Sequence, residues 1–360
     1  MNRSLALKVG VASAALASAA LLVPACAAGD SNEKSAAPKT DAAPIEAVII
    51  DDAGPDADAA PPPSLGGRSF VAQNVYLGDT DEDGGADPNA WAQFGTDIDG
   101  IDTTAAESSD VCTPVEGANP AVAIDGTNGI DNSFGKNVLP VFAQLGASGF
   151  SASLDESIAT GGPSLMVNLN GLTDDPNQTA SQLDAQLISV VHPDRVPTWT
   201  TSDSWNVYRS GLVDGTIPSG GKARFATSII TSGVWSSGSF GDVSLTLAFG
   251  AASLDVVVHH ASVSFTHSSA HNATNGVVSG VVKTSELLAS VQIVLSQSGL
   301  CAVAGELVPQ IAAASDIMQY GTNASGATCD GISIGIGFDA IESASPNAIA
   351  SDPVPGAGCP

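Results

Sequence analysis

Residues 332–338 read ISIGIGF, and this stretch decides the fold class of the chain. Three isoleucines and Phe338 occupy every second position, with serine and glycine between them, which is the two-residue period of a half-buried β-strand. The stretch VSLTLAF at 243–249 shows the same alternation. Both stretches are therefore predicted to be strands with one face in a core.

Further strand candidates are separated by Gly, Asn, Asp, Ser and Pro. They lie at 164–172, 185–192, 223–230, 254–265 and 276–282. No helix alternates with them, so we expect a mainly β fold, an antiparallel β-sandwich-like domain over 68–345, rather than βαβ units. A short C-terminal helical insertion is predicted at about 285–318, with one helix from Glu286 and a second from Pro309. A tail at 346–360 follows.

The first 25 residues have the composition of a secretory signal peptide. Arg3 and Lys8 precede an uncharged run of Ala, Leu, Val, Ser and Gly that ends in small residues. This run is shorter than the roughly 20 apolar residues of a membrane-spanning helix. We therefore expect cleavage of residues 1–25 and export of the chain.

Residues 22–26 read LVPAC, which resembles the lipobox of bacterial lipoproteins. In that family a small residue precedes a cysteine that is acylated on sulfur and becomes the new N-terminus. The resemblance implies acyl chains such as palmitate on Cys26 and anchoring in the lipid bilayer. Pro24 departs from the small or hydroxylated residue usual there, and ordinary signal cleavage to a soluble secreted protein is the alternative. Ala27, in place of Asp, favours sorting to the outer membrane or cell surface.

Residues 26–67 are predicted to form a disordered tether between this anchor and the domain. Ala, Pro, Asp and Ser dominate, as in DDAGPDADAA at 51–60 and PPPS at 61–64. Such a composition buries too little apolar surface to offset the chain entropy lost on folding.

Cysteine parity agrees with lipid on Cys26, because four other cysteines remain in an exported chain. An even number in an oxidising compartment predicts two disulfides, and four cysteines allow three connectivities. Pairing Cys301 with Cys329 closes the shortest loop and leaves Cys112 to join Cys359. This is the connectivity that we expect.

The chain is strongly acidic, with a formal net charge of −27. Without residues 1–25, nine Lys and Arg residues stand against 38 Asp and Glu residues, giving −29. Nucleic acids and anionic lipid head groups are bound by Lys and Arg clusters, so the sequence excludes nucleic acid as a partner. Acidity of this degree indicates cation binding or solubility outside the cell.

The acidic residues concentrate in a loop region at 79–132. DTDEDGGAD at 79–87 places carboxylates at alternate positions before Gly84, and such carboxylates can converge on one hard cation while the glycine permits a tight turn. The loop resembles those of thrombospondin type 3 and dockerin repeats, whereas Ala90 stands where an EF-hand has its bidentate Glu. We expect structural calcium somewhere in 79–132. The first candidate ligands are Asp79, Asp81, Asp83 and Asp87.

Two further acidic turns are alternative calcium sites. One group is Asp97, Asp99 and Asp102, and the other is Asp125, Asn128, Asp131 and Asn132. The competing explanation is that Asp, Asn and Gly are the common turn formers, since Asx side chains bond their own backbone.

Three motifs resemble signatures of a set of uncharacterised secreted bacterial lipoproteins. They read FGTDIDGIDTT, DGTNGIDNSFG and TCDGISIGIGFDAI. The resemblance covers most of 68–345 and implies an exported location and a β-rich architecture. That family has no established activity to carry over.

No catalytic residue is assigned. GISIG at 331–335 has the form of a nucleophile elbow, but the residues after Ser333 continue as a strand and no histidine follows His271, so a serine hydrolase is rejected. Ser333 is instead expected to be a small outward-facing residue. Four histidines between 259 and 271 do not converge on a metal if they lie along one strand.

The sequence thus predicts a structural or binding module of the cell envelope rather than an enzyme, with a polysaccharide or an envelope protein as its partner. The alternative is a carbohydrate-binding module or carbohydrate-active hydrolase, in which Trp199 and Trp205 would stack on sugar rings. No cofactor other than calcium is expected.

Overall fold

The computed structural model describes residues 65–106, 109–144, 149–194, 196–249, 252–354 and 356–360. The predicted signal peptide, Cys26 and all but the last three residues of the predicted tether lie outside these ranges. Within them, none of the helices combines the length and the apolar character needed to cross a membrane.

The strands belong to one large sheet. They are β1 (Arg68–Tyr76), β2 (Ser164–Asn170), β3 (Ala180–Val191), β4 (Asn206–Tyr208), β5 (Ala223–Thr231), β6 (Val234–Ser236), β7 (Gly241–Phe249), β8 (Ala252–Ser269), β9 (Asn272–Lys283), β10 (Gly331–Ser343) and β11 (Ile349–Ala350). Their order is β11-β4-β3-β2-β1-β10-β9-β8-β6-β5, with β7 beside β8. Neighbours are antiparallel except β11 and β4. The predicted class, mainly β with antiparallel strands, is confirmed.

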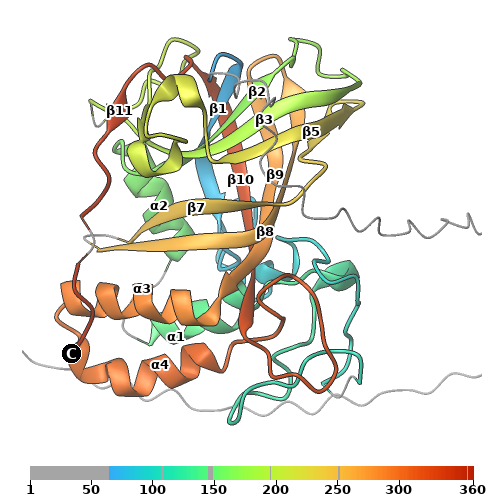
Figure 1. Cartoon of the computed structure of the whole chain (residues 1–360), viewed down its shortest axis with the longest axis vertical. Helices are drawn as coiled ribbons and strands as arrows, with labels where there is room; N and C mark the ends of the chain where they lie inside the picture. The colour runs from blue at the N-terminus through green and yellow to red at the C-terminus, as the bar shows by residue number, and fades with distance from the viewer. Residues whose placement is uncertain (1–64, 107–108, 145–148, 195, 250–251, 355) are drawn as a thin grey trace, which may run out of the picture. The chain divides into compact units, whose positions relative to one another are not determined.

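The sheet closes on itself, because β5 pairs with β3 as well as with β6. Strand β8 has different neighbours along its length. Its first half pairs with β7, and its second half pairs with β6 and β9. In Figure 1, β7 and β8 cross in front of β1 and β10. The two layers of the sandwich-like domain are therefore parts of one continuous sheet.

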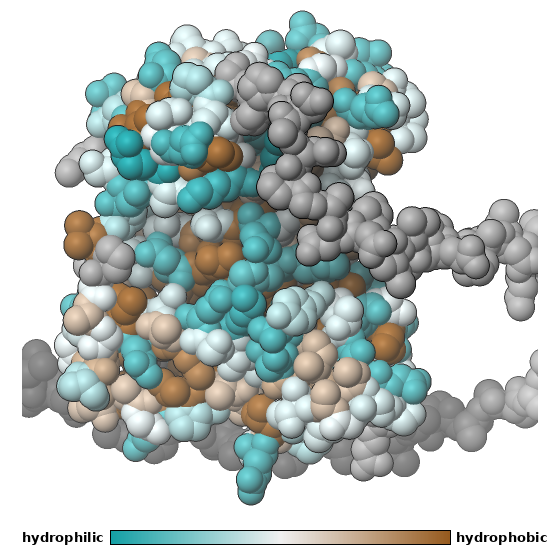
Figure 2. Space-filling model, viewed as in Figure 1, coloured by the Kyte–Doolittle hydropathy of each residue, from teal (hydrophilic) through white to brown (hydrophobic). Residues whose placement is uncertain are grey.

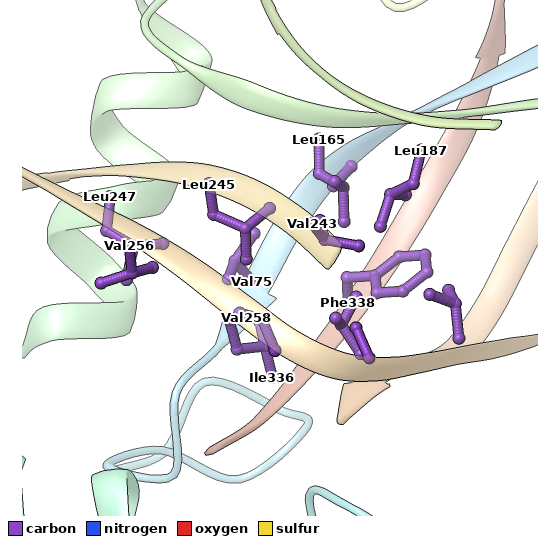
Figure 3. Packing of buried hydrophobic residues seen from close by; sticks show 14 of the residues in the cluster. Val75, Leu165, Leu187, Val243, Leu245, Leu247, Val256, Val258, Ile336 and Phe338 are labelled. Carbon is purple, nitrogen blue, oxygen red and sulfur yellow. The ribbon is translucent and has the colours of Figure 1, made fainter. Parts of the chain in front are cut away.

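The core lies between these two layers (Figure 3). Val243, Leu245 and Leu247 of β7 lie opposite Ile336 and Phe338 of β10, and each is less than a tenth exposed. Burying a side chain of this size contributes roughly 1.5–3 kcal/mol. The outer surface, viewed as in Figure 1, is a mosaic of hydrophilic and hydrophobic residues (Figure 2). The alternation read from ISIGIGF and VSLTLAF thus does place one face of each strand in the core.

Short helices join the strands. The α-helices are α1 (Leu139–Ala143), α2 (Phe150–Ala159), α3 (Thr284–Gln297) and α4 (Ala304–Ala312). Single turns are η1 (Ala90–Ala92), η2 (Thr127–Gly129), η3 (Phe134–Val138), η4 (Arg209–Gly211), η5 (Ile217–Ser219) and η6 (Cys301–Val303). The adjacent helices α3 and α4 form the predicted helical insertion (Figure 1). The second helix begins at Ala304, however, and Pro309 lies inside it rather than at its start.

The predicted disulfide connectivity is wrong. Cys112 is bonded to Cys329 and Cys301 to Cys359, with S–S distances of 2.01 and 2.12 Å. Loop length misled the prediction, because the tertiary fold decides which cysteines meet. Residues 113 and 328 form a parallel β-bridge, and this pairing brings the neighbouring residues Cys112 and Cys329 close together.

Residues 346–360 are part of the same domain. Strand β11 extends the sheet beside β4, and the last residues return along α3 before Cys359 reaches Cys301. Two disulfides in one domain suggest an oxidising environment such as the outside of the cell.

Glycines on the outer face of β10 allow another segment to lie directly on the strand. A Cβ on Gly335 would be 2.1 Å from the carbonyl oxygen of Phe94. Phe94 lies outside the sheet, in the acidic loop region, so this contact decides where that region packs. Only glycine leaves room for it.

Replacing Gly335 by Ala is expected to lower the free energy of unfolding by about 1–3 kcal/mol, the usual effect of overpacking. Gly305→Ala is the control, because its Cβ meets no atom within 4 Å. Gly305 is the second residue of α4, outside the helix interior in which Ala is favoured over Gly by about 0.5–1 kcal/mol, so this change should leave the stability nearly unchanged. Urea denaturation measures both effects, and equal stabilities would contradict the close contact.

Candidate metal centre

The outer face of β10 is covered by residues 90–135. Ser333 and Gly335 alternate with the buried isoleucines and face this segment. The fully satisfied side chain of Asn132 ties the two together: its Nδ2 donates to the carbonyls of Phe94 at 3.0 Å and of Gly335 at 3.1 Å. The acidic loop region is thus held on the strand by buried hydrogen bonds.

Three carboxylates converge where this segment turns back on itself. Asp97 and Asp99 come from one turn and Asp131 from another, and one oxygen of each lies within 4.8 Å of the other two. Asp97 is exposed, Asp99 is half-buried and Asp131 is only 4% exposed. The turns are joined by the N–H of Asp131, which donates to the carbonyl of Thr96 at 3.0 Å. In the described part of the chain, this is the group of carboxylates arranged to hold a metal ion.

Hydrogen bonds orient each of the three carboxylates. Each accepts one backbone N–H at 2.7–2.8 Å. Asp131 accepts from Ile98, the residue between Asp97 and Asp99, so the two turns are bonded side chain to backbone as well. The amide of Asn323 donates to the second oxygen of Asp99.

The disulfide between Cys112 and Cys329 anchors this arrangement. The N–H of Cys112 donates to Oδ1 of Asn323 at 2.8 Å, and the N–H of Cys329 donates to the carbonyl of Thr113 at 3.0 Å. Asn323 therefore links the disulfide to the carboxylate of Asp99. The covalent bond restrains one side of the acidic group.

Two more carboxylates lie next to the three. Oδ2 of Asp125 accepts the N–H of Thr103 at 2.6 Å. Asp316 is buried against β10, where its two oxygens accept the N–H of Ser333 at 2.9 Å and its hydroxyl at 2.5 Å. The expectation that Ser333 faces outward is therefore wrong: it is fully buried, and its Oγ also accepts the N–H of Ser133 at 2.8 Å.

These carboxyls are poorly solvated and repel one another. Burial raises the pKa of Asp131 well above its usual range, and the charge of Asp316 raises it further. Burial likewise raises the pKa of Asp125 and of Asp99, and it raises the pKa of Asp316 to about 7. The nearby ammonium of Lys136 is itself partly buried and donates to two backbone carbonyls. An added positive charge beside the group would favour its ionised form at neutral pH.

In the first predicted calcium loop, residues 79–87, three of the carboxylates accept hydrogen bonds from the protein itself. Asp81 accepts the backbone N–H of Asp83 at 3.1 Å and of Gly85 at 2.7 Å, as in an Asx turn. Asp87 does the same for Asn89, and Asp79 accepts the N–H and hydroxyl of Ser151. The structure does not bring these four carboxylates together as a metal group.

The predicted sugar platform is also not formed. Trp205 is fully buried, with its ring edge-on to His192 at 5.1 Å between centroids. Trp199 is partly buried against it at 5.6 Å. Because this pair packs in the core, Trp205 offers no face to a sugar ring.

Sequence reasoning separated residues that the fold unites. Asp97 and Asp99 were placed in one acidic turn and Asp131 in another, and Asp316, Asn323 and Ser333 were not linked to either. A signal existed for Asp316, which stands alone among apolar residues in AAASDIM at 312–318. An acid in such surroundings is seldom buried without a partner.

Comparison of the chain with protein-family models, curated proteins and solved structures finds no match. What the site can do is therefore argued from its geometry.

Asp131→Asn is expected to stabilise the protein in chelator at pH 8 but not near pH 4. A carboxyl with a raised folded-state pKa supplies stability while it is protonated and loses it as the pH rises above about 4. Asn keeps the acceptor for the N–H of Ile98 and cannot ionise. Melting temperatures from pH 4 to pH 8 should show the variant progressively above the wild type. A constant difference would exclude ionisation as the cause.

Proposed function

We propose that the protein is an exported binding or structural module whose acidic segment is held on β10 by a calcium ion. The observation that carries the proposal is the convergence of Asp97, Asp99 and Asp131. Two disulfides agree with a compartment outside the cytoplasm, where calcium is a suitable structural ion. The ion would offset the repulsion among the ligands and among Asp125 and Asp316 behind them.

The ligand set favours calcium over other divalent ions. All three ligands are carboxylate oxygens, which suit hard cations, whereas zinc prefers cysteine and histidine. Opposite ligands of Ca²⁺ stand about 4.6–5.2 Å apart and those of Mg²⁺ about 4.0–4.2 Å apart. The three oxygens lie within 4.8 Å of one another, a separation that a calcium ion can bridge. The exposed side, at Asp97, leaves room for water to complete the coordination.

We further propose that the mature chain is attached to the cell envelope by lipid on Cys26. Support comes from the LVPAC stretch and from the polar, Pro-rich residues up to 67, which would separate the domain from the membrane surface. In this position the domain would present its sheet and acidic segment to polysaccharides or proteins of the envelope. The calcium site would keep that surface folded outside the cell.

Calcium is expected to raise the melting temperature of the wild type by several degrees at pH 7.5. Asp131→Asn removes one of three ligands and should weaken calcium binding by about 100-fold or more. Asp83→Asn is the control, because it makes the same charge change at an exposed residue in the first loop. Calorimetric titration after dialysis against EGTA checks the affinities. If Asp83→Asn weakened binding as much as Asp131→Asn, the ion would lie elsewhere.

The lipid anchor predicts that the full chain, expressed with residues 1–25 in a bacterium, partitions into the detergent phase on phase separation. Cys26→Ser should move it to the aqueous phase without changing its melting temperature. Intact-mass measurement would show the acyl chains on the wild type alone. Wild-type protein that is aqueous and unmodified at Cys26 would contradict the anchor and leave the calcium proposal intact.

A further inference from the structure

A separate cavity of about 190 Å³ lies where the acidic segment stops covering β10. Ser333 and Gly335 lie on the outer face of the strand and are covered by that segment. Asp339 lies farther along the same face and lines the cavity. Residues from β1, β9 and the loops after β1 complete the wall. The cavity is far larger than a water molecule requires.

Irregular strand pairing places Asp339 at this cavity. The register between β9 and β10 shifts between Phe338 and Ala340, and the register between β1 and β10 shifts at the neighbouring position. Such bulges re-aim side chains and are common beside binding sites. Asn275, opposite the shift, takes a left-handed conformation with φ of 51°, which costs a non-glycine residue free energy.

The carboxylate of Asp339 is held at two points. Its Oδ1 accepts the N–H of Asn275 at 3.1 Å, and its Oδ2 accepts the hydroxyl of Tyr76 at 3.0 Å. A carboxylate has about four acceptor positions, so both oxygens can still accept from a ligand. The backbone of Asn275 at the strand irregularity and the hydroxyl of Tyr76 therefore orient the carboxylate through hydrogen bonds and bring no positive charge to it.

One wall of the cavity is aromatic. Tyr76 and Phe94 are stacked, with ring centroids 5.4 Å apart and planes 7° from parallel. The missing side chain of Gly337 makes this possible, since a Cβ there would be 2.4 Å from the ring of Phe94. The rings are nearly buried, so the cavity combines apolar surface with the carboxylate.

The charge of the cavity is unbalanced. Glu82 lines it as a second carboxylate, and none of the described residues around it is Lys, Arg or His. Gln93 and Asn275 add carboxamide side chains that can accept or donate hydrogen bonds. Two carboxylates beside apolar ring surface are complementary to a cation with hydrocarbon substituents, because such a cation gains from charge and apolar contact together.

We propose that this cavity binds a small organic ammonium ion, a primary or quaternary amine, between Asp339, Glu82 and the Tyr76–Phe94 wall. A metal ion fits less well, since the cavity is too large and these two acids are not part of a converging metal group among the described residues. The inference goes beyond the calcium proposal and uses different residues.

Titrations of ¹⁵N-labelled full chain at saturating calcium test the proposal, with tetramethylammonium and butylammonium as probes. At least one should shift the resonances of Gln93 and Asn275 in a saturable manner. The neutral molecule tert-butanol, close in shape to tetramethylammonium, should bind at least about tenfold more weakly, a difference of about 1.4 kcal/mol. Added NaCl should weaken binding of the ammonium ion.

Two variants locate the site. Asp339→Asn preserves the shape and an acceptor for the N–H of Asn275, and should weaken ammonium binding about tenfold or more. Glu82→Gln changes an exposed side chain that does not support the fold, and should weaken binding about threefold. Asp83→Asn makes the same charge change next to the cavity lining and should have little effect.

The outcomes separate the explanations. Binding of neither ammonium probe, or equal binding of tert-butanol, would overturn the proposal. Equal weakening by Asp83→Asn and Glu82→Gln would show a general charge effect and would also overturn it. Saturable binding of glucose without ammonium binding would replace it by a sugar site. The titration is repeated in EGTA with Asp131→Asn, which lacks the proposed calcium site. Ammonium binding that is the same there as in the wild type with calcium depends on this cavity alone.

Discussion

Strand β10 is packed on both of its faces. One face needs large apolar side chains, and the other needs small ones. Its isoleucines fill the core against β7 and β8, while serine and glycine on the other side let residues 90–135 lie directly on the backbone. Asn132 completes this contact by satisfying carbonyls from both partners. This layer of contact brings Asp131 over β10, and it places Phe94 in the aromatic wall of the neighbouring cavity.

The same contact explains why the acidic group is costly. Packing against β10 removes water from Asp131 and Asp316, and the raised pKa values follow from that loss of solvation. A fold without a cation would gain by replacing these acids with neutral residues. The proposed ion would offset the charge of these two buried acids.

Local pattern was sufficient for seven of the strands, β2, β3, β5, β7, β8, β9 and β10, and for helices α3 and α4, whereas β1, β4, β6 and β11 were not predicted. Period-two alternation identified β7 and β10, and the four-residue recurrence of Leu287, Val291 and Leu295 identified α3. Helices α1 and α2 were not predicted, although Leu154 and Ile158 of α2 show the same spacing. The spacing of apolar residues indicates that one face of a strand or helix is buried. It identifies the strand or helix only where that face is strongly apolar.

Long-range pairing could not be predicted in the same way. The acids of 97–99 and 131 were recognised as ligand candidates, but their convergence depends on how two turns fold over β10. The participation of Asp316, near 200 residues away in the chain, depends on the register of the sheet. Disulfide connectivity failed for the same reason: loop length is a property of the chain, and cysteine proximity is a property of the tertiary structure.

The bond between Cys301 and Cys359 fastens the penultimate residue to the turn between α3 and α4. Cys329, which is bonded to Cys112, lies within the loop that Cys301 and Cys359 close, so the two disulfides form one covalent network around β10. If the hydrogen bonds of the sheet broke under tension, this network would still keep the acidic segment, β10 and the helix pair joined.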